Sequence, residues 1–244
     1  MNEAVILLTL CSATILTSII SATIGIAGGI LLLSLMTFFY PMSVIIPIHG
    51  VVQLLSNGSR VLFLKEKISK PLFWTTSLGI PFGTVIAVLG LKHLSGEKAI
   101  ILGVVTLIIY SVFKPKKMPS LKLPLWGYFF LGMTIGILGP FIGATGPLLG
   151  PFMIRDDLSK EEIISTQASI QVIGHIMKIP AFLAVGFNFL NYWPTIIFMS
   201  LCALIGTKWG VYLLRRLPEK PFRILFKAAM LVSAVRLIMK FLLN

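Results

Sequence analysis

Apolar stretches long enough to cross a bilayer follow one another along the chain, from Ala4 to Leu243. A helix needs about 20 apolar residues to span the hydrocarbon core, where it satisfies its own backbone polar groups. The stretches do not alternate apolar with polar residues, as the strands of a membrane β-barrel do. Only 12% of the residues are charged, against about 25% in soluble domains. The sequence therefore predicts an all-α, polytopic membrane protein.

The formal net charge is +13, and most of the Lys and Arg residues lie between the apolar stretches. Basic loops of this kind orient membrane proteins, so we expect a lipid bilayer as the partner of these charges and not a nucleic acid. Cys11 and Cys202 both lie inside apolar stretches, and no metal-ligand spacing surrounds them. We therefore expect no disulfide framework, no metal and no cofactor.

A spacing of 118 residues relates uncommon residues of the two halves of the chain. Glycines, a glutamine and a basic residue recur at that spacing, in the pairs Gly25 and Gly143, Gly28 and Gly146, Gln53 and Gln171, and Arg60 and Lys178. Such recurrence indicates an internal duplication. We predict a first transmembrane repeat over residues 1–113, a basic cytoplasmic linker over 114–123 and a second transmembrane repeat over 124–244.

The first apolar stretch, residues 4–39, is too long for one straight span. Its 36 residues would make a helix of about 54 Å, against a hydrocarbon core of about 30 Å. Small residues interrupt it in "ISATIGIAGGILLLSL", residues 20–35, and "GPFIGATGP" interrupts the matching stretch 124–155. We predict that each stretch forms a pair of helices, the second of them short.

The loop charges predict how the repeats are oriented. Basic residues mark the loops at 65–70, 114–122 and 215–223 as cytoplasmic, whereas 40–43 and 188–192 carry no charge. This distribution predicts two inverted repeats of about five helical segments each, with one broken, re-entrant pair per repeat. Lys92 and Lys98 count against the inverted arrangement, because it places them outside. The alternative is four parallel spans in each half.

Inverted repeats with broken helices are typical of transporters, whose substrate sites lie where the broken ends meet. A short helix presents free N–H groups with partial positive charge at its start, which suits an anion, and glycine lets a ligand approach the backbone. The alternative is close helix packing through small residues. The candidate substrate-binding residues at the breaks are Gly25, Ala27, Gly28, Gly29, Gly143, Thr145 and Gly146.

The segment after each break carries polar residues on one helical face. The first set is His49, Gln53, Asn57 and Arg60, and the second, at the same spacing, is Gln167, Gln171, His175 and Lys178. Polar groups are costly in lipid, so both faces should point into the bundle. We predict that His49, Gln53, Asn57, Gln171 and His175 bind substrate and that Arg60 and Lys178 form an electrostatic gate. The alternatives are interhelical hydrogen bonds for the uncharged residues and snorkelling for the basic ones.

All eight acidic residues lie near the ends of the apolar stretches or in loops. The absence of an acidic residue within the stretches argues against a cation pump and an intramembrane aspartyl protease. The sequence also contains no H-E-x-x-H, G-x-S-x-G or P-loop motif. We therefore expect a protein that is not an enzyme.

These features resemble the TauE/SafE family of sulfite and organosulfur-anion exporters. The resemblance rests on "IGIAGG", on Pro47 to Gly50 in the following helix, on the basic loop and on "GATGPLLGPF". The family typically has a G-x-G-G-G run followed by a proline. Gly25, Gly28 and Gly29 match this pattern, and Ala27 and Ile30 depart from it. The resemblance implies transport of small sulfur-containing anions such as sulfite, thiosulfate, sulfoacetate or taurine-related compounds.

Together, the residues and the resemblance predict a multi-pass protein of the plasma membrane that moves a small inorganic or organosulfur anion. Alternating access around a site at the repeat interface is the expected mechanism. A passive anion channel and a non-transporting membrane scaffold are the alternatives. The anion chemistry comes from the residues, whereas the choice of sulfur comes from the resemblance alone. No oligomeric state is predicted.

Overall fold

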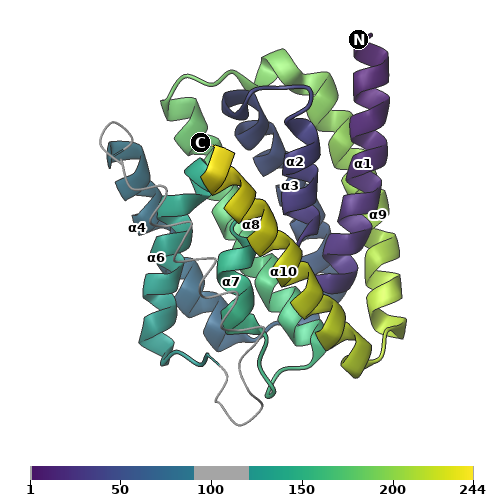
Figure 1. Cartoon of the computed structure of the whole chain (residues 1–244). Coiled ribbons are helices and arrows are strands. Elements are labelled where there is room, and N and C mark those ends of the chain that lie inside the picture. Colours follow the sequence, from purple (N-terminus) through teal and green to yellow (C-terminus); the bar gives the residue numbers. More distant parts are fainter. Residues whose placement is uncertain (1, 91–120, 244) are drawn as a thin grey trace.

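The computed structural model describes residues 2–90 and 121–243, and the regular secondary structure of that part is helical (Figure 1). The first half contains α1 (Glu3–Ile24), α2 (Gly28–Met36), α3 (Met42–Leu64), the short 3-10 helix η1 (Lys65–Lys67) and α4 (Lys70–Gly90). The second half contains α6 (Leu125–Ile142), α7 (Gly146–Met153), α8 (Lys160–Ala184), the 3-10 helix η2 (Phe189–Tyr192), α9 (Trp193–Arg216) and α10 (Glu219–Leu243). Lys92, Lys98 and most of the predicted linker 114–123 lie outside the described residues.

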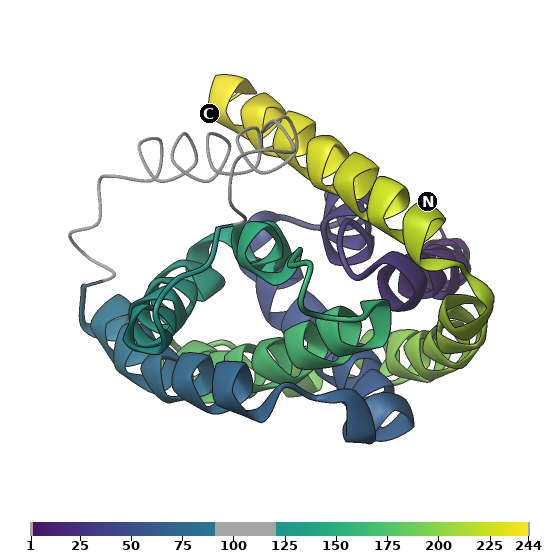
Figure 2. The same cartoon turned by 90° about the horizontal axis from the view of Figure 1, so that it is seen from below.

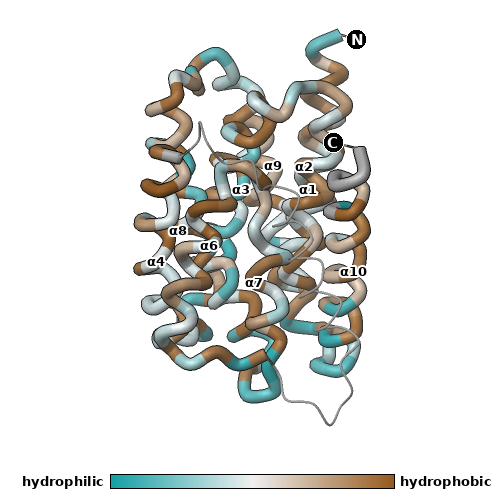
Figure 3. Tube along the Cα trace, turned by 60° about the vertical axis from the view of Figure 1, so that its left-hand side comes forward, coloured by the Kyte–Doolittle hydropathy of each residue, from teal (hydrophilic) through white to brown (hydrophobic). Residues whose placement is uncertain are grey.

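Four of the described segments are long and apolar enough to cross a membrane: Glu3–Ile24, Lys70–Leu89, Leu125–Ile142 and Phe189–Arg216. Their large apolar side chains, such as Leu8, Phe82 and Trp126, are exposed on the outside of the bundle. Figure 3 shows hydrophobic positions along the helices and hydrophilic segments at both the upper and the lower ends of the view. These observations confirm the predicted all-α class and agree with a membrane setting.

Both long apolar stretches are split where the small residues occur. In the first, α1 ends at Ile24, Gly25 has φ of +89°, and α2 begins at Gly28. In the second, α6 ends at Ile142, Gly143 has φ of +81°, and α7 begins at Gly146. L-residues with side chains rarely adopt a positive φ, so glycine is required at both turns. The matching geometry agrees with the duplication read from the 118-residue spacing.

The tightest helix contacts join one half of the chain to the other. The α4 helix packs against α6, where a Cβ on Gly83 would overlap the carbonyl oxygen of Met133. The α1 helix packs against α9, where a Cβ on Gly210 would lie 2.6 Å from the Ile19 oxygen. Figure 2 shows both pairs side by side. The predicted duplication would pair α1 with α6 and α9 with α4, and these two contacts would then be equivalent.

The α3 and α8 helices pack against each other in the interior of the bundle and contact α9 and α4, respectively. Neither is among the membrane-span candidates, because the polar face of each lowers its mean hydropathy. Cys11 on α1 and Cys202 on α9 are free thiols. The interior position of α3 and α8 brings the two predicted polar faces to the place where the broken helices meet.

Candidate functional site

The polar faces of α3 and α8 point into the bundle, as the cost of polar groups in lipid requires. The imidazole rings of His49 on α3 and His175 on α8 have centroids 6.3 Å apart and an interplanar angle of 73°. The other members of these faces are also buried, namely Gln53, Asn57 and Arg60 on α3 and Gln167 and Lys178 on α8, whereas Gln171 is half-buried. The two polar faces therefore form one polar layer.

The start of α2 faces the polar layer through Gly29. A Cβ on Gly29 would lie 3.6 Å from the Gln53 amide nitrogen, and His49 donates a hydrogen bond from Nε2 to the Gly29 oxygen at 2.8 Å. Gly28 instead packs against α1, because a Cβ there would overlap the Thr17 oxygen. Of the two adjacent glycines, Gly29 therefore faces the candidate site. Gly28 instead allows α2 to pack closely against α1, which is the role that the alternative interpretation gave to these small residues.

The start of α7 has the same arrangement. A Cβ on Gly146 would lie 3.7 Å from Oε1 of Gln171 and 3.8 Å from Nε2 of Gln167. Thr145 is buried at the N-cap position, but its side chain makes no capping hydrogen bond. The side chain of Ala27 cannot cap α2. Both short helices therefore begin without a side-chain cap and with a glutamine amide close by.

Arg60 and Lys178 each reach the end of the long helix in a broken pair. Arg60 donates from Nη2 to Oγ of Ser21 on α1 at 3.0 Å. Lys178 donates from Nζ to the oxygen of Gly143, and its Cε lies 3.2 Å from the Cβ position of Gly139 on α6. Ser21 and Gly139 are also 118 residues apart. The carbonyl end of a helix carries partial negative charge, so a cation is favourable there.

These two cations are buried deep in the bundle. Arg60 is 0% exposed and Lys178 is 3% exposed. The snorkelling alternative is therefore wrong for Arg60, because its guanidinium does not reach the surface. No ion pair within the described residues involves either side chain; those present lie in the loops and at helix ends. Nε and Nη1 of Arg60 also have no hydrogen-bond partner there. Positive charge without a buried counter-charge favours an anionic ligand.

Gln167 is a site residue that our prediction did not include. Its Nε2 donates to the Gly146 oxygen at 3.5 Å, and its Oε1 lies 3.3 Å from the Cβ position of Gly25. That oxygen is buried and has no hydrogen-bond partner in the described part of the chain. Gln167 thus lies between the two breaks. The duplication is the signal that identifies it, because Gln167 holds the position of His49 in the second half.

Residues 10–237 match the family described as Sulfite exporter TauE/SafE. The chain belongs to this family. The match covers nearly the whole chain and confirms the resemblance carried by "IGIAGG" and "GATGPLLGPF". No curated protein and no solved structure matches the chain. The TauE/SafE assignment makes the chain a membrane protein of a transporter family.

Ala27 stands in this TauE/SafE protein where the family pattern has glycine. Its φ is +71°, and it is the one residue other than glycine with a positive φ in the described ranges 2–90 and 121–243. A sparsely populated backbone conformation of this kind costs a residue with a side chain on the order of 1–3 kcal/mol. The departure from the family pattern therefore leaves the backbone turn intact and adds strain to it.

The loop after α7 is held to the first turn of α6 by a polar cluster whose charged members, Arg155 and Asp157, lie outside the membrane-spanning segments. Arg155 pairs with Asp157 through two hydrogen bonds, of 3.0 and 2.6 Å, and donates a third, of 3.0 Å, to the Tyr128 hydroxyl. The Arg155 guanidinium lowers the pKa of Asp157, and the same pair raises the pKa of Arg155. Ser159 and Glu162 form a capping box that starts α8, and the Ser159 backbone N–H lowers the pKa of Glu162.

Proposed function

We propose that this TauE/SafE protein transports small sulfur-containing anions, of the sulfite, thiosulfate or sulfonate type, across the plasma membrane. The proposed mechanism is alternating access around the polar layer between two inverted repeats. The observation that carries the proposal is the pair of buried cations, Arg60 and Lys178, which have no carboxylate partner among the described residues. A buried charge of this kind is costly unless a ligand of opposite charge visits it.

The chemistry around the cations fits an oxyanion. Uncapped starts of α2 and α7 provide backbone N–H groups, and the helix dipoles add partial positive charge. Gln53, Gln167 and Gln171 provide neutral amide donors beside those starts. Because backbone and amide donors bind oxygen atoms and do not compete for protons, they suit sulfite and sulfonate groups.

The positions of the short helices support the inverted orientation. In Figure 1, α2 lies in the upper part of the bundle and α7 in the lower part, so the two broken pairs open toward opposite ends. The contact of α1 with α9 becomes the contact of α6 with α4 when the halves are exchanged, which supports the duplication itself. Opposed broken pairs around one central layer give a site that either side of the membrane can reach in turn.

Ligand binding to purified protein tests the proposal most directly. Sulfite, thiosulfate, sulfate, a sulfonate and acetate are added in turn, and the melting temperature is recorded. A ligand at 100 times its Kd stabilises the folded state by about 2.7 kcal/mol, so a sulfur anion should raise the melting temperature and acetate should not. If no anion raises it, the scaffold alternative holds.

The matched variants Arg60→Gln and Arg216→Gln test whether the buried cation binds the anion. Arg216 is exposed near the end of α9 and stacks on Tyr212, with its Cζ 4.1 Å from the ring centroid. Arg60→Gln should remove the stabilisation by the anion, and Arg216→Gln should keep it. Flux of the same anion into proteoliposomes then separates the mechanisms, because electrogenic flux at channel-like rates would contradict alternating access.

A further inference from the structure

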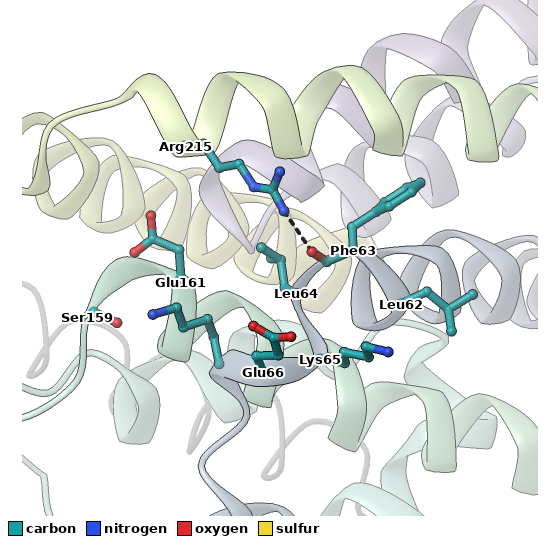
Figure 4. A pocket seen from close by; sticks show the side chains of 9 residues that line it. Leu62, Phe63, Leu64, Lys65, Glu66, Ser159, Glu161 and Arg215 are labelled. Atoms are coloured by element: carbon teal, nitrogen blue, oxygen red, sulfur yellow. Dashed lines mark hydrogen bonds between the residues drawn. The ribbon is translucent and has the colours of Figure 1, made fainter.

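A pocket opens at the end of the bundle where α3 stops (Figure 4). Its volume is about 510 Å³. Its lining comes from the last turn of α3 and η1 (residues 62–67), from Ser159 and Glu161 at the start of α8, and from Arg215 near the end of α9. The loop charges assign this end of the bundle to the cytoplasm. None of these residues belongs to the site described above.

The rim of the pocket is held in place by hydrogen bonds between distant segments. Ser165 on α8 donates from Oγ to the Lys67 oxygen at 2.7 Å, and Thr166 accepts the Ser69 N–H at 2.9 Å. Arg215 donates from Nη2 to the Phe63 oxygen at 2.9 Å. η1 is thereby fixed to α8, and the end of α3 to α9. These hydrogen bonds fix the segments that surround the pocket relative to one another.

The charged residues of the pocket favour anions. Lys65, Lys67 and Arg215 are exposed cations in its lining. Glu66 and Glu161 also line it, but the Glu161 carboxylate lies 3.3 Å from the ammonium group of Lys160. A mouth in which cations outnumber free carboxylates raises the local concentration of small anions.

Leu64 connects this pocket with the helical face of α3 that carries the buried cation Arg60. It lines the pocket, yet its own exposure is 4%. Arg60 lies one helical turn before Leu64, on the same face of α3, and is 0% exposed. Ile164 of α8, one turn before Gln167, belongs to the same buried apolar cluster as Leu64 and packs on Gly25. Buried apolar side chains thus lie next to both the charged pocket, at Leu64, and the first break, at Ile164.

We propose that the pocket is the cytoplasmic vestibule of the transport site and that Leu64, together with Ile164, forms an apolar gate between the vestibule and Arg60. The inference rests on the proposed function, because it assigns an entry path to the same site. The duplication supplies a counterpart, since Phe182 and Ile46 hold the positions of Leu64 and Ile164 in the opposite halves. Ile46 packs against Gly143, with Cγ1 3.4 Å from its Cβ position, as Ile164 packs against Gly25. Alternating access would open the two apolar layers in turn.

Thiol labelling tests the gate. Arg60→Cys is introduced into a background carrying Cys11→Ala and Cys202→Ala, and an anionic methanethiosulfonate reagent is applied from the cytoplasmic side of inside-out vesicles. Adding Leu64→Ala should speed labelling of the introduced thiol about tenfold, which corresponds to about 1.4 kcal/mol of barrier. Leu62→Ala is the matched control, because Leu62 lines the same pocket but is 74% exposed. Equal labelling rates in the three proteins would overturn the gate.

Flux through proteins that keep Arg60 gives a second readout if the labelling variant does not fold. Leu64→Ala should change thiosulfate flux into proteoliposomes by about tenfold, whereas Leu62→Ala should leave it unchanged. Equal flux in both variants would contradict the gate. Stabilisation of the wild-type protein by thiosulfate is measured alongside. If thiosulfate does not stabilise the wild-type protein, the proposed function is contradicted. If thiosulfate stabilises it but the two variants have equal flux, only the gate is contradicted.

Discussion

Gln53 and Gln171 approach the two short helices from matched positions, 118 residues apart. Each amide lies beside a glycine in the first turn of a helix that has no side-chain cap, Gln53 beside Gly29 and Gln171 beside Gly146. A leucine has similar volume but cannot hydrogen-bond an oxyanion. The role of these residues is therefore testable without opening a cavity.

Gln53→Leu or Gln171→Leu should abolish anion transport and leave folding intact, because each removes an amide donor from the candidate site and keeps its volume. Transport is measured as thiosulfate uptake into proteoliposomes, and folding as the melting temperature in detergent. Thr134→Val is the control, since Thr134 is exposed on α6 and its hydroxyl donates within its own helix to Phe130. Normal uptake by both glutamine variants would remove these residues from the site.

The Asp157 carboxylate should contribute to stability in a pH-dependent way. Arg155 lowers its pKa, so the ion pair stabilises the folded state above the ordinary carboxyl pKa of about 3.9 and is lost as the pH falls through the lowered value. Asp157→Asn should lower stability at pH 7 by at most about 1 kcal/mol, because the pair is partly exposed. The difference from wild type should shrink as the medium is acidified.

Melting temperatures measured from neutral to acidic pH check this expectation. Asp156→Asn is the control, because the Asp156 side chain is 93% exposed and lies 3.7 Å from Arg223. A difference between wild type and Asp157→Asn that grows toward low pH would show that Arg155 does not act on this carboxylate.

At the scale of helices, small residues decide which segments pack closely. Ile15 lies against Gly206 and Ile19 against Gly210, so α1 and α9 run parallel with an offset of 191 residues. The same offset places Cys11 opposite Cys202. The close approach comes from glycines, which let two helix backbones meet in the membrane. The register of α1 and α9 can therefore be measured with residues that the chain already contains.

Mild oxidation with copper phenanthroline should join Cys11 to Cys202, because the common offset places the two thiols opposite each other on closely packed helices and a disulfide needs such proximity. The product is identified by peptide mass before and after reduction. Moving the second thiol to the lipid-facing side, with Leu201→Cys and Cys202→Ala, should prevent the bond, since Leu201 is 52% exposed. Equal cross-linking of the two proteins would contradict the register.

At the scale of the whole molecule, the orientation of the halves separates the two topologies considered. Phe38 and Asp156 follow the two short helices at positions 118 residues apart, and both are exposed. Inverted repeats place them on opposite sides of the membrane. Four parallel spans in each half would place them on the same side. These two residues are thus a matched pair of reporters.

In a background without Cys11 and Cys202, Phe38→Cys should react with an impermeant thiol reagent from outside the cell, and Asp156→Cys only from the cytoplasmic side. Labelling of right-side-out and inside-out vesicles measures both. Lys65→Cys is the control for the cytoplasmic side, because it lies in the basic loop after α3. Labelling of both reporters from one side would support the parallel arrangement.

Local patterns were sufficient to predict the helices, both breaks and the polar faces. A helix in lipid must pair its own backbone groups, so a run of apolar residues becomes a helix wherever its neighbours lie. Glycines that adopt a positive φ end the long helices for an equally local reason. Polar residues at helical spacing face inward because lipid penalises them. Each of these outcomes depends on residues within a few turns of one another.

The tertiary structure decided how those faces meet. It separated Gly28, which packs on α1, from Gly29, which faces Gln53. The fold also buries the Arg60 guanidinium against Ser21, although the position of Arg60 near the end of its apolar stretch had suggested snorkelling. Gln167 comes to lie between the two breaks. Lipid is as apolar as the helix surfaces it touches, so hydrophobicity does not choose a helix's partner. That choice depends on the fit of side chains far apart in the chain, which no local period encodes.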